Sequence, residues 1–173
     1  MNKYKEIEGN LIELALLGKF DIISHGVNCF CTMGSGIAPL MAKAFGCDKF
    51  TLENEIYKGD YNKMGQIDFE PFTFTANGIR KSNPNDIFVG DVSLYVVNSY
   101  SQYYYGSHPS NSGTPLDYDA LRMCFRKINH AFPDKKIGLP LIGCGLAKGD
   151  WNIVSQMIKE ELKDMDVVIV KLQ

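Results

Sequence analysis

The chain has 173 residues, of which 45% are hydrophobic and 22% charged, values typical of one globular domain that spans residues 1–173 and has a substantial core. A formal net charge of -2 excludes a general nucleic-acid binder that works by neutralising phosphates. No apolar run approaches the ~20 residues that span a bilayer, and residues 1–10 lack the apolar core of a signal peptide. The five cysteines follow no framework spacing, so we expect reduced thiols in a cytoplasmic protein without a membrane partner.

Apolar spacing and turn residues predict strands and helices that alternate along the first half of the chain. In order, the sequence predicts a strand at 4–8, a helix at 11–17, a strand at 21–27, a helix at 37–45, a second helical segment at 47–58 with Asp48 as its N-cap, and one or two edge-type strands at 66–75 around Pro71. Residues 76–86 contain Asn-Gly and Asn-Pro, which are typical of turns, so a surface excursion is expected there.

The second half continues the alternation. It predicts a central strand at 92–98, a long polar loop at 99–114, a helix at 115–132, a short strand at 137–142, a helix at 151–162 and a last strand at 167–172. Because the strands are apolar throughout rather than alternating with polar residues, the sheet is expected to be covered by helices on both faces. The sequence therefore predicts the α/β class.

Two glycine-rich loops each follow a predicted strand and open a helix. The first contains Gly34, Ser35 and Gly36, and the second covers residues 143–149. Loops of this kind present backbone N–H groups beside a helix N-terminus, where an anion binds. In an α/β sheet both loops would lie at the carboxyl edge of the strands, where ligands bind. The pattern alone predicts a phosphorylated or dinucleotide-like ligand.

The two loops resemble those of the macrodomain family. Residues 25–38, HGVNCFCTMGSGIA, are similar to its first ligand loop, and residues 139–151, LPLIGCGLAKGDW, to its second. The nearest branch is the Appr-1-p processing type, which includes ADP-ribose 1''-phosphate phosphatase and the terminal ADP-ribose protein glycohydrolase. The resemblance implies a three-layer α/β/α sandwich with a mixed, mostly parallel sheet. It also implies ADP-ribose or ADP-ribose 1''-phosphate in a cleft between the loops, with no cofactor.

The same resemblance implies which residues surround the ligand. Asn10 takes the place of an acid that meets the adenine amino group, and Asn28 would meet the distal ribose. The diphosphate would lie on backbone N–H groups of the two loops. The expected ligand-binding set is Asn10, Leu11, Asn28, Met33, Gly34, Ser35, Gly36, Ile37, Ile142, Gly143, Cys144, Gly145, Leu146 and Ala147.

Two residues are candidates for catalysis. His25 would act as a general acid or base near the distal ribose, and its alternative role is a strand-end histidine bonded to backbone. Asp150 would orient an attacking water, and its alternative role is the N-cap of the following helix.

The terminal glycohydrolase uses a lysine after the central strand and an aspartate in the second loop. Here residues 99–102 contain no lysine and Ala147 stands at the acid position, so a lysine-adduct mechanism is not expected. The first loop, with His25 three residues before Asn28, most resembles the phosphatase, and this resemblance implies hydrolysis of ADP-ribose 1''-phosphate. The alternatives are removal of ADP-ribose from an ADP-ribosylated protein or nucleic acid, and a reader that binds ADP-ribose without turnover.

The remaining polar groups near the loops have competing interpretations. Cys29, Cys31 and Cys144 are interpreted as small buried thiols rather than nucleophiles, and no metal is expected at the Cys29-x-Cys31 pair. Lys148 is interpreted as a solvated charge. The three tyrosines at 103–105 either cover the ligand or pack on the surface. Three further side chains are candidates to line the cleft or to cap the strand end: Asn98, Ser99 and Gln102.

Overall fold

The computed structural model describes residues 3–54, 56–106 and 113–173, which build a seven-stranded sheet in the order β1-β7-β6-β2-β5-β3-β4. The strands are β1 (Tyr4–Glu8), β2 (Ile22–Asn28), β3 (Ile67–Thr75), β4 (Gly78–Lys81), β5 (Leu94–Gln102), β6 (Lys136–Leu139) and β7 (Asp166–Lys171). β1, β7, β6, β2 and β5 pair in parallel, whereas β3 runs antiparallel to both β5 and β4. The sheet is therefore mixed and mostly parallel, as predicted.

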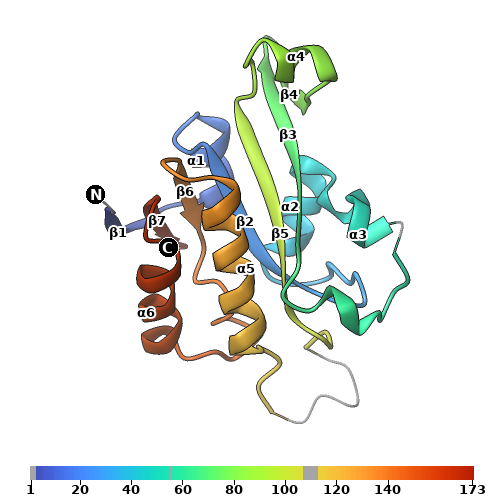
Figure 1. Ribbon diagram of the computed structural model, residues 1–173, viewed down its shortest axis with the longest axis vertical. Coiled ribbons are helices and arrows are strands. Elements are labelled where there is room, and N and C mark those ends of the chain that lie inside the picture. The colour runs from blue at the N-terminus through green and yellow to red at the C-terminus, as the bar shows by residue number, and fades with distance from the viewer. Residues whose placement is uncertain (1–2, 55, 107–112) are drawn as a thin grey trace.

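Helices cover both faces of this sheet (Figure 1). They are α1 (Leu11–Leu16), α2 (Ala38–Phe45), α3 (Thr51–Asn54), α4 (Pro84–Phe88), α5 (Tyr118–Ala131) and α6 (Trp151–Glu161), with the 3-10 turns η1 (Cys47–Lys49) and η2 (Tyr61–Lys63). α5 and α6 lie on one face, and α1, α2 and the short α3 lie on the other. The three-layer α/β/α architecture implied by the family resemblance is confirmed.

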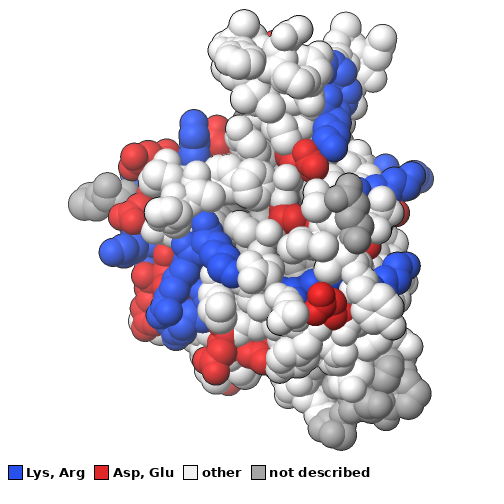
Figure 2. Space-filling model, turned by 45° about the vertical axis from the view of Figure 1, so that its right-hand side comes forward, with Lys and Arg blue, Asp and Glu red and all other residues white. Residues whose placement is uncertain are grey.

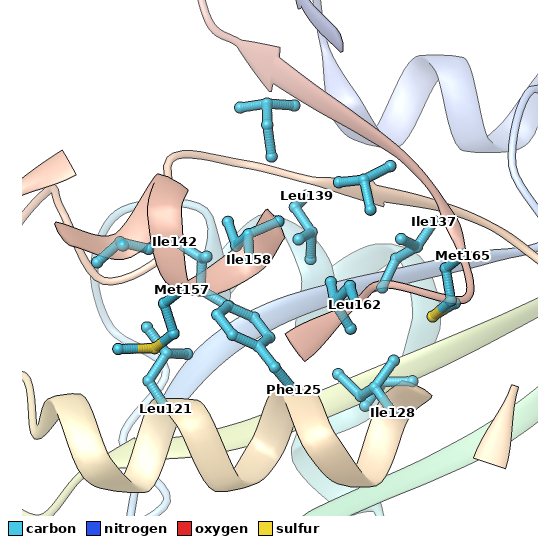
Figure 3. Close-up of a cluster of buried hydrophobic side chains, with 14 of the residues drawn as sticks. Leu121, Phe125, Ile128, Ile137, Leu139, Ile142, Met157, Ile158, Leu162 and Met165 are labelled. Atoms are coloured by element: carbon cyan, nitrogen blue, oxygen red, sulfur yellow. The ribbon is translucent and has the colours of Figure 1, made fainter. Parts of the chain in front are cut away.

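Each face of the sheet buries its own hydrophobic cluster. On the face covered by α5 and α6, Leu121, Phe125 and Ile128 share one side of α5 and point toward α6 and the sheet (Figure 3). In the centre of the sheet, Ile22 belongs to this cluster and Ile23 to the cluster beneath α1 and α2. Consecutive strand residues point to opposite faces, so a strand buried on both sides is apolar at successive positions, as residues 167–170 of β7 are.

A close helix-to-sheet approach depends on Gly138 in β6. A Cβ atom at this position would lie 2.7 Å from the ring of Phe20 and 2.9 Å from Leu11. We expect Gly138→Ala to lower the free energy of unfolding by about 1–3 kcal/mol, because a tightly packed core absorbs an added methyl group only by strain. Chemical denaturation measures the change, and a variant as stable as the wild type would contradict this packing.

The central strand is longer than predicted. Residues 99–102 were expected to begin a loop, but they continue β5 as far as Gln102, and Ser99 and Ser101 are buried. The Oγ atoms of Ser24 and Ser99 lie 2.8 Å apart inside the sheet. β2 and β3 pair with opposite edges of β5, so its backbone is satisfied even though its side chains are polar.

The prediction of one helical segment at 47–58 is wrong, because the chain forms two short separate helical turns there. The chain forms η1 after Gly46, becomes extended at Phe50 and starts α3 at the next residue. Asp48 lies in the first turn of η1 and does not cap it, because the N-cap position belongs to Gly46.

The excursion at 76–86 contains more structure than the turn expected. β4 pairs with the end of β3, and α4 begins at a capping box formed by Asn83 and Asp86, with Arg80 Nη1 2.7 Å from Asp86 Oδ2. These elements project from the body, and Phe88 at their end is 90% exposed (Figures 1 and 2).

Positive and negative side chains are interspersed over the face in Figure 2. Among the described helices, none has the length and apolar character needed to cross a membrane.

Candidate ligand site

A cavity of about 1000 Å³ opens at the carboxyl ends of all five parallel strands. Its lining includes Gly9 after β1, Asn28 at the end of β2, Gln102 at the end of β5, Pro140 after β6 and Val170 in β7. The two glycine-rich loops form much of the remaining wall. This volume suits a small-molecule or nucleotide ligand.

Most of the predicted ligand-binding residues line this cavity. They are Asn10, Leu11, Asn28, Gly34, Ser35, Gly36, Ile37, Ile142, Gly143, Cys144, Gly145, Leu146 and Ala147. Met33 is the exception, because it does not line the cavity: it packs against the buried cluster beneath α1 and α2, and its Sδ lies 3.8 Å from Cys47 Sγ.

Asn28 organises the first loop. Its Oδ1 accepts hydrogen bonds from the N–H groups of Phe30 at 3.0 Å and Thr32 at 3.3 Å, and its Nδ2 donates to the carbonyl of Thr32 at 2.9 Å. Cys31, between these two partners, has φ 60 in the left-handed region. The amide of Asn28 thus fixes the turn that leads into the glycines, in addition to facing the cavity.

The two loops present backbone donors without protein acceptors. Within the described residues, no carbonyl accepts from the N–H groups of Gly34, Ser35 and Gly36 in the first loop, or of Gly143, Gly145 and Leu146 in the second. The amide of Cys144 was also expected to face the ligand, but it donates to Leu141 O at 3.0 Å within a turn. Such oriented N–H groups form an anion-binding concavity.

The opposite end of the cavity is mostly apolar. Leu11, Val170 and Leu172 line it together with Asn10. Asn10 is also the N-cap of α1, since its Oδ1 accepts from the N–H of Glu13 at 3.1 Å. An amide oxygen has two lone pairs, so this bond leaves one acceptor position on Asn10.

His25 lies in β2 but does not line the cavity, and it is 0% exposed. Asn98 Nδ2 donates to Cys47 O at 2.9 Å, so Asn98 Oδ1 is turned to accept from His25 Nε2 at 2.7 Å. Nδ1 of His25 has no partner among the described residues. Burial lowers the pKa of His25 to about 4, against the opposing effect of the Asn98 hydrogen bond. The ring is therefore neutral and enclosed, a position that offers it no contact with a ligand in the cavity.

Asp150 also lies outside the cavity lining. It is exposed and is the N-cap of α6, with its Oδ1 accepting from the N–H of Asn152 at 2.8 Å. The side chain therefore has the capping role that the sequence offered as the alternative to catalysis.

The tyrosines after β5 pack together on one aromatic ring. The rings of Tyr103, Tyr104 and Tyr105 have centroids 5.1, 5.6 and 6.1 Å from that of Phe30, and Tyr105 also lines the cavity. Of the polar residues in β5, Ser101 and Gln102 line the cavity, while Asn98 and Ser99 are fully buried and do not line it. Residues 107–112, which belong to the predicted long loop, lie outside the described residues.

Two buried charged residues beneath the first loop, Lys63 and Glu53, were not predicted. Lys63 is 1% exposed, and its Nζ lies 3.0 Å from Cys31 Sγ and 3.4 Å from Cys29 O. Glu53 is also 1% exposed, and burial raises its pKa. Nothing local in the sequence marks either residue, because lysine and glutamate normally lie in solvent.

Among the described residues, no group of three or more histidines, cysteines and acids is placed to hold a metal ion.

The chain is similar in sequence to a phage protein and in structure to solved macrodomains. No family model matches it. An uncharacterised 17.5 kDa protein from the tk-vs intergenic region of Enterobacteria phage T4 is 30% identical over 174 residues, covering 96% of this chain and 94% of that protein. The macrodomain of Mycobacterium tuberculosis DarG matches with a TM-score of 0.64 at 19% identity, covering 98% of each chain. Thermosipho africanus DarTG, solved in complex with ADP-ribose, matches with a TM-score of 0.68 at 15% identity over 100% of this chain and 42% of its own.

Proposed function

The chain belongs to the family of the phage T4 17.5 kDa protein and has the macrodomain fold, and on this premise we propose that its cavity binds ADP-ribose. The observation that carries the proposal is the pair of glycine-rich loops with unpaired N–H groups on either side of one cavity. The diphosphate lies on these loops, because backbone donors beside a helix N-terminus stabilise anions. The complex of DarTG with ADP-ribose supports the same ligand on the same fold.

The two ends of the cavity suit the two ends of this ligand. The apolar end with Leu11 and Val170 accommodates the flat adenine base, and Asn10 offers a polar contact to its edge. The end with Asn28 and Gln102 has amide groups that hydrogen-bond ribose hydroxyls.

We further propose hydrolysis of ADP-ribose 1''-phosphate to ADP-ribose and phosphate. The described lining residues include no carboxylate and no imidazole, so an attacking water or a departing group receives little acid–base help there. A phosphate group is ionised near neutral pH and departs as an anion without first gaining a proton. A nitrogen-linked leaving group needs protonation, so this lining favours the phosphate ester. Oriented N–H groups of the loops stabilise the charge.

The same lining favours a second candidate, a reader that binds ADP-ribose without turnover. Removal of ADP-ribose from a modified protein or nucleic acid is a further alternative, and an ADP-ribosylated macromolecule would then be the partner. The described lining has no acid to protonate a nitrogen-linked leaving group, so this alternative suits an ester-linked one. We place the protein in the cytoplasm, since all five cysteines are free thiols.

Two measurements on the wild-type protein separate these functions. Calorimetric titration with ADP-ribose is expected to give a Kd on the order of 1–100 µM, and the absence of binding at millimolar ligand would exclude the proposal. Incubation with ADP-ribose 1''-phosphate is expected to release inorganic phosphate. Binding without phosphate release would identify the reader, and release of ADP-ribose from a modified peptide or oligonucleotide would identify the macromolecular substrate.

A further inference from the structure

We propose that Lys148 contacts the diphosphate of the bound ligand and is the residue that selects for its charge. The proposal rests on the proposed function and adds a specific ionic contact to it. Lys148 follows the backbone donors of the second loop and lines the cavity. Its side chain was interpreted from the sequence as a solvated charge.

The backbone at Lys148 is unusual for its residue type. Lys148 has φ 59, in the left-handed region that side chains with a Cβ atom rarely adopt. Its N–H donates to Gly145 O at 3.0 Å, and the next N–H, of Gly149, donates to Gly143 O at 2.8 Å, so the turn holds this conformation. Left-handed backbone brings the Cβ atom of a side chain close to the following carbonyl oxygen, a strain that glycine avoids. A lysine in this position therefore stores strain beside a ligand cavity, and strain of this kind points to a use for the side chain.

The charge of Lys148 is also unmatched by the protein. It is the one charged side chain among the described residues that line the cavity, and it takes part in none of the ion pairs of the described part of the chain. Its side chain is exposed. Lys148 lies in the same loop as the free N–H groups of Gly145 and Leu146, so its ammonium group adds a full positive charge to the partial charges of that loop. An anionic ligand supplies the missing partner.

The experiment separates the side chain from the backbone conformation. Lys148→Gly removes the ammonium group and relieves the left-handed strain, so the free energy of unfolding is expected to stay equal or rise. The affinity for ADP-ribose is expected to fall roughly five- to tenfold, because one partly exposed charge-assisted hydrogen bond is lost. Lys148→Arg, which keeps the charge, is expected to bind within about twofold of wild type. Added salt is expected to narrow the difference between wild type and Lys148→Gly.

A matched control lies elsewhere in the chain. Asp134 has φ 64, also in the left-handed region, and does not line the cavity. Asp134→Gly is expected to relieve strain in the same way while leaving the affinity for ADP-ribose unchanged.

The outcomes distinguish this inference from the proposed function. If wild type and Lys148→Gly bind ADP-ribose equally well, the role of Lys148 is wrong and the ADP-ribose site stands. If wild type does not bind ADP-ribose, the proposed function is wrong, and the same titration is made with inorganic pyrophosphate. Weaker pyrophosphate binding by Lys148→Gly than by wild type would then support the contact, and equal binding or none would overturn it.

Discussion

Gly145→Ala is expected to remove most of the affinity for ADP-ribose while leaving the stability of the protein unchanged. Gly145 lines the cavity, and a Cβ atom added there would meet no heavy atom within 4 Å. Its φ lies outside the left-handed region, so alanine introduces no backbone strain. The new methyl group would occupy the space through which a phosphate approaches the loop. We expect affinity to fall at least about tenfold, since hydrogen bonds to a charged group contribute about 1.5–3 kcal/mol each.

Two companion variants make this result specific. Gly34→Ala in the first loop is expected to behave in the same way, because its Cβ would meet only a methyl group of Thr32, at 3.9 Å. Gly138→Ala in β6 is the reverse case, a loss of stability at a site outside the cavity. Thermal unfolding and calorimetric titration of all three variants give the comparison. If Gly145→Ala binds ADP-ribose as tightly as wild type, the second loop does not receive the diphosphate.

The features that the sequence predicted well are determined by neighbouring residues. The strand, glycine-rich loop and helix around Gly34 could be located because apolar spacing, glycine and the helix start lie within one short stretch. Asp150 was predicted to be catalytic, with a helix cap as the alternative that local sequence offered, and the structure shows the capping bond from the N–H of Asn152. The parallel pairing of β1 and β7, by contrast, joins opposite ends of the chain and was not predicted.

The features that were missed depend on contacts distant in sequence. Met33 lies within the predicted loop, yet its side chain turns away from the cavity to pack near Cys47. Lys63 and Glu53 are buried because α3 and η2 fold beneath the first loop, an arrangement that no local pattern encodes. Strand alternation was visible around His25, but its face relative to the cavity depends on how η1 packs on β2 and β5.

His25 gives a second large effect, in the dependence of stability on pH. Its pKa is about 4 in the folded protein because of burial, against an ordinary value of 6.5. Between these values the unfolded chain binds a proton that the folded chain does not, so stability rises with pH across this window. The contribution of His25 is fully present above pH 6.5 and is lost as the pH falls toward 4, a change of about 3 kcal/mol. Burial raises the pKa values of Glu53 and Asp68, which act in the opposite direction because their folded forms hold protons more tightly.

Comparison of wild type with His25→Gln isolates this contribution from that of the carboxyl groups. Glutamine does not titrate and retains a group that can hydrogen-bond Asn98. We expect the stability difference between wild type and variant, measured by denaturant unfolding from pH 7 to pH 4.5, to shrink as the pH falls. Because His25 does not line the cavity, phosphate release from ADP-ribose 1''-phosphate at pH 7 is expected to stay within about threefold of wild type, whereas general acid–base catalysts contribute ~100-fold or more. A loss of about 100-fold in a variant that remains folded at pH 7 would instead establish the catalytic role predicted from the sequence, and would require the sheet to open at β2 when the ligand binds.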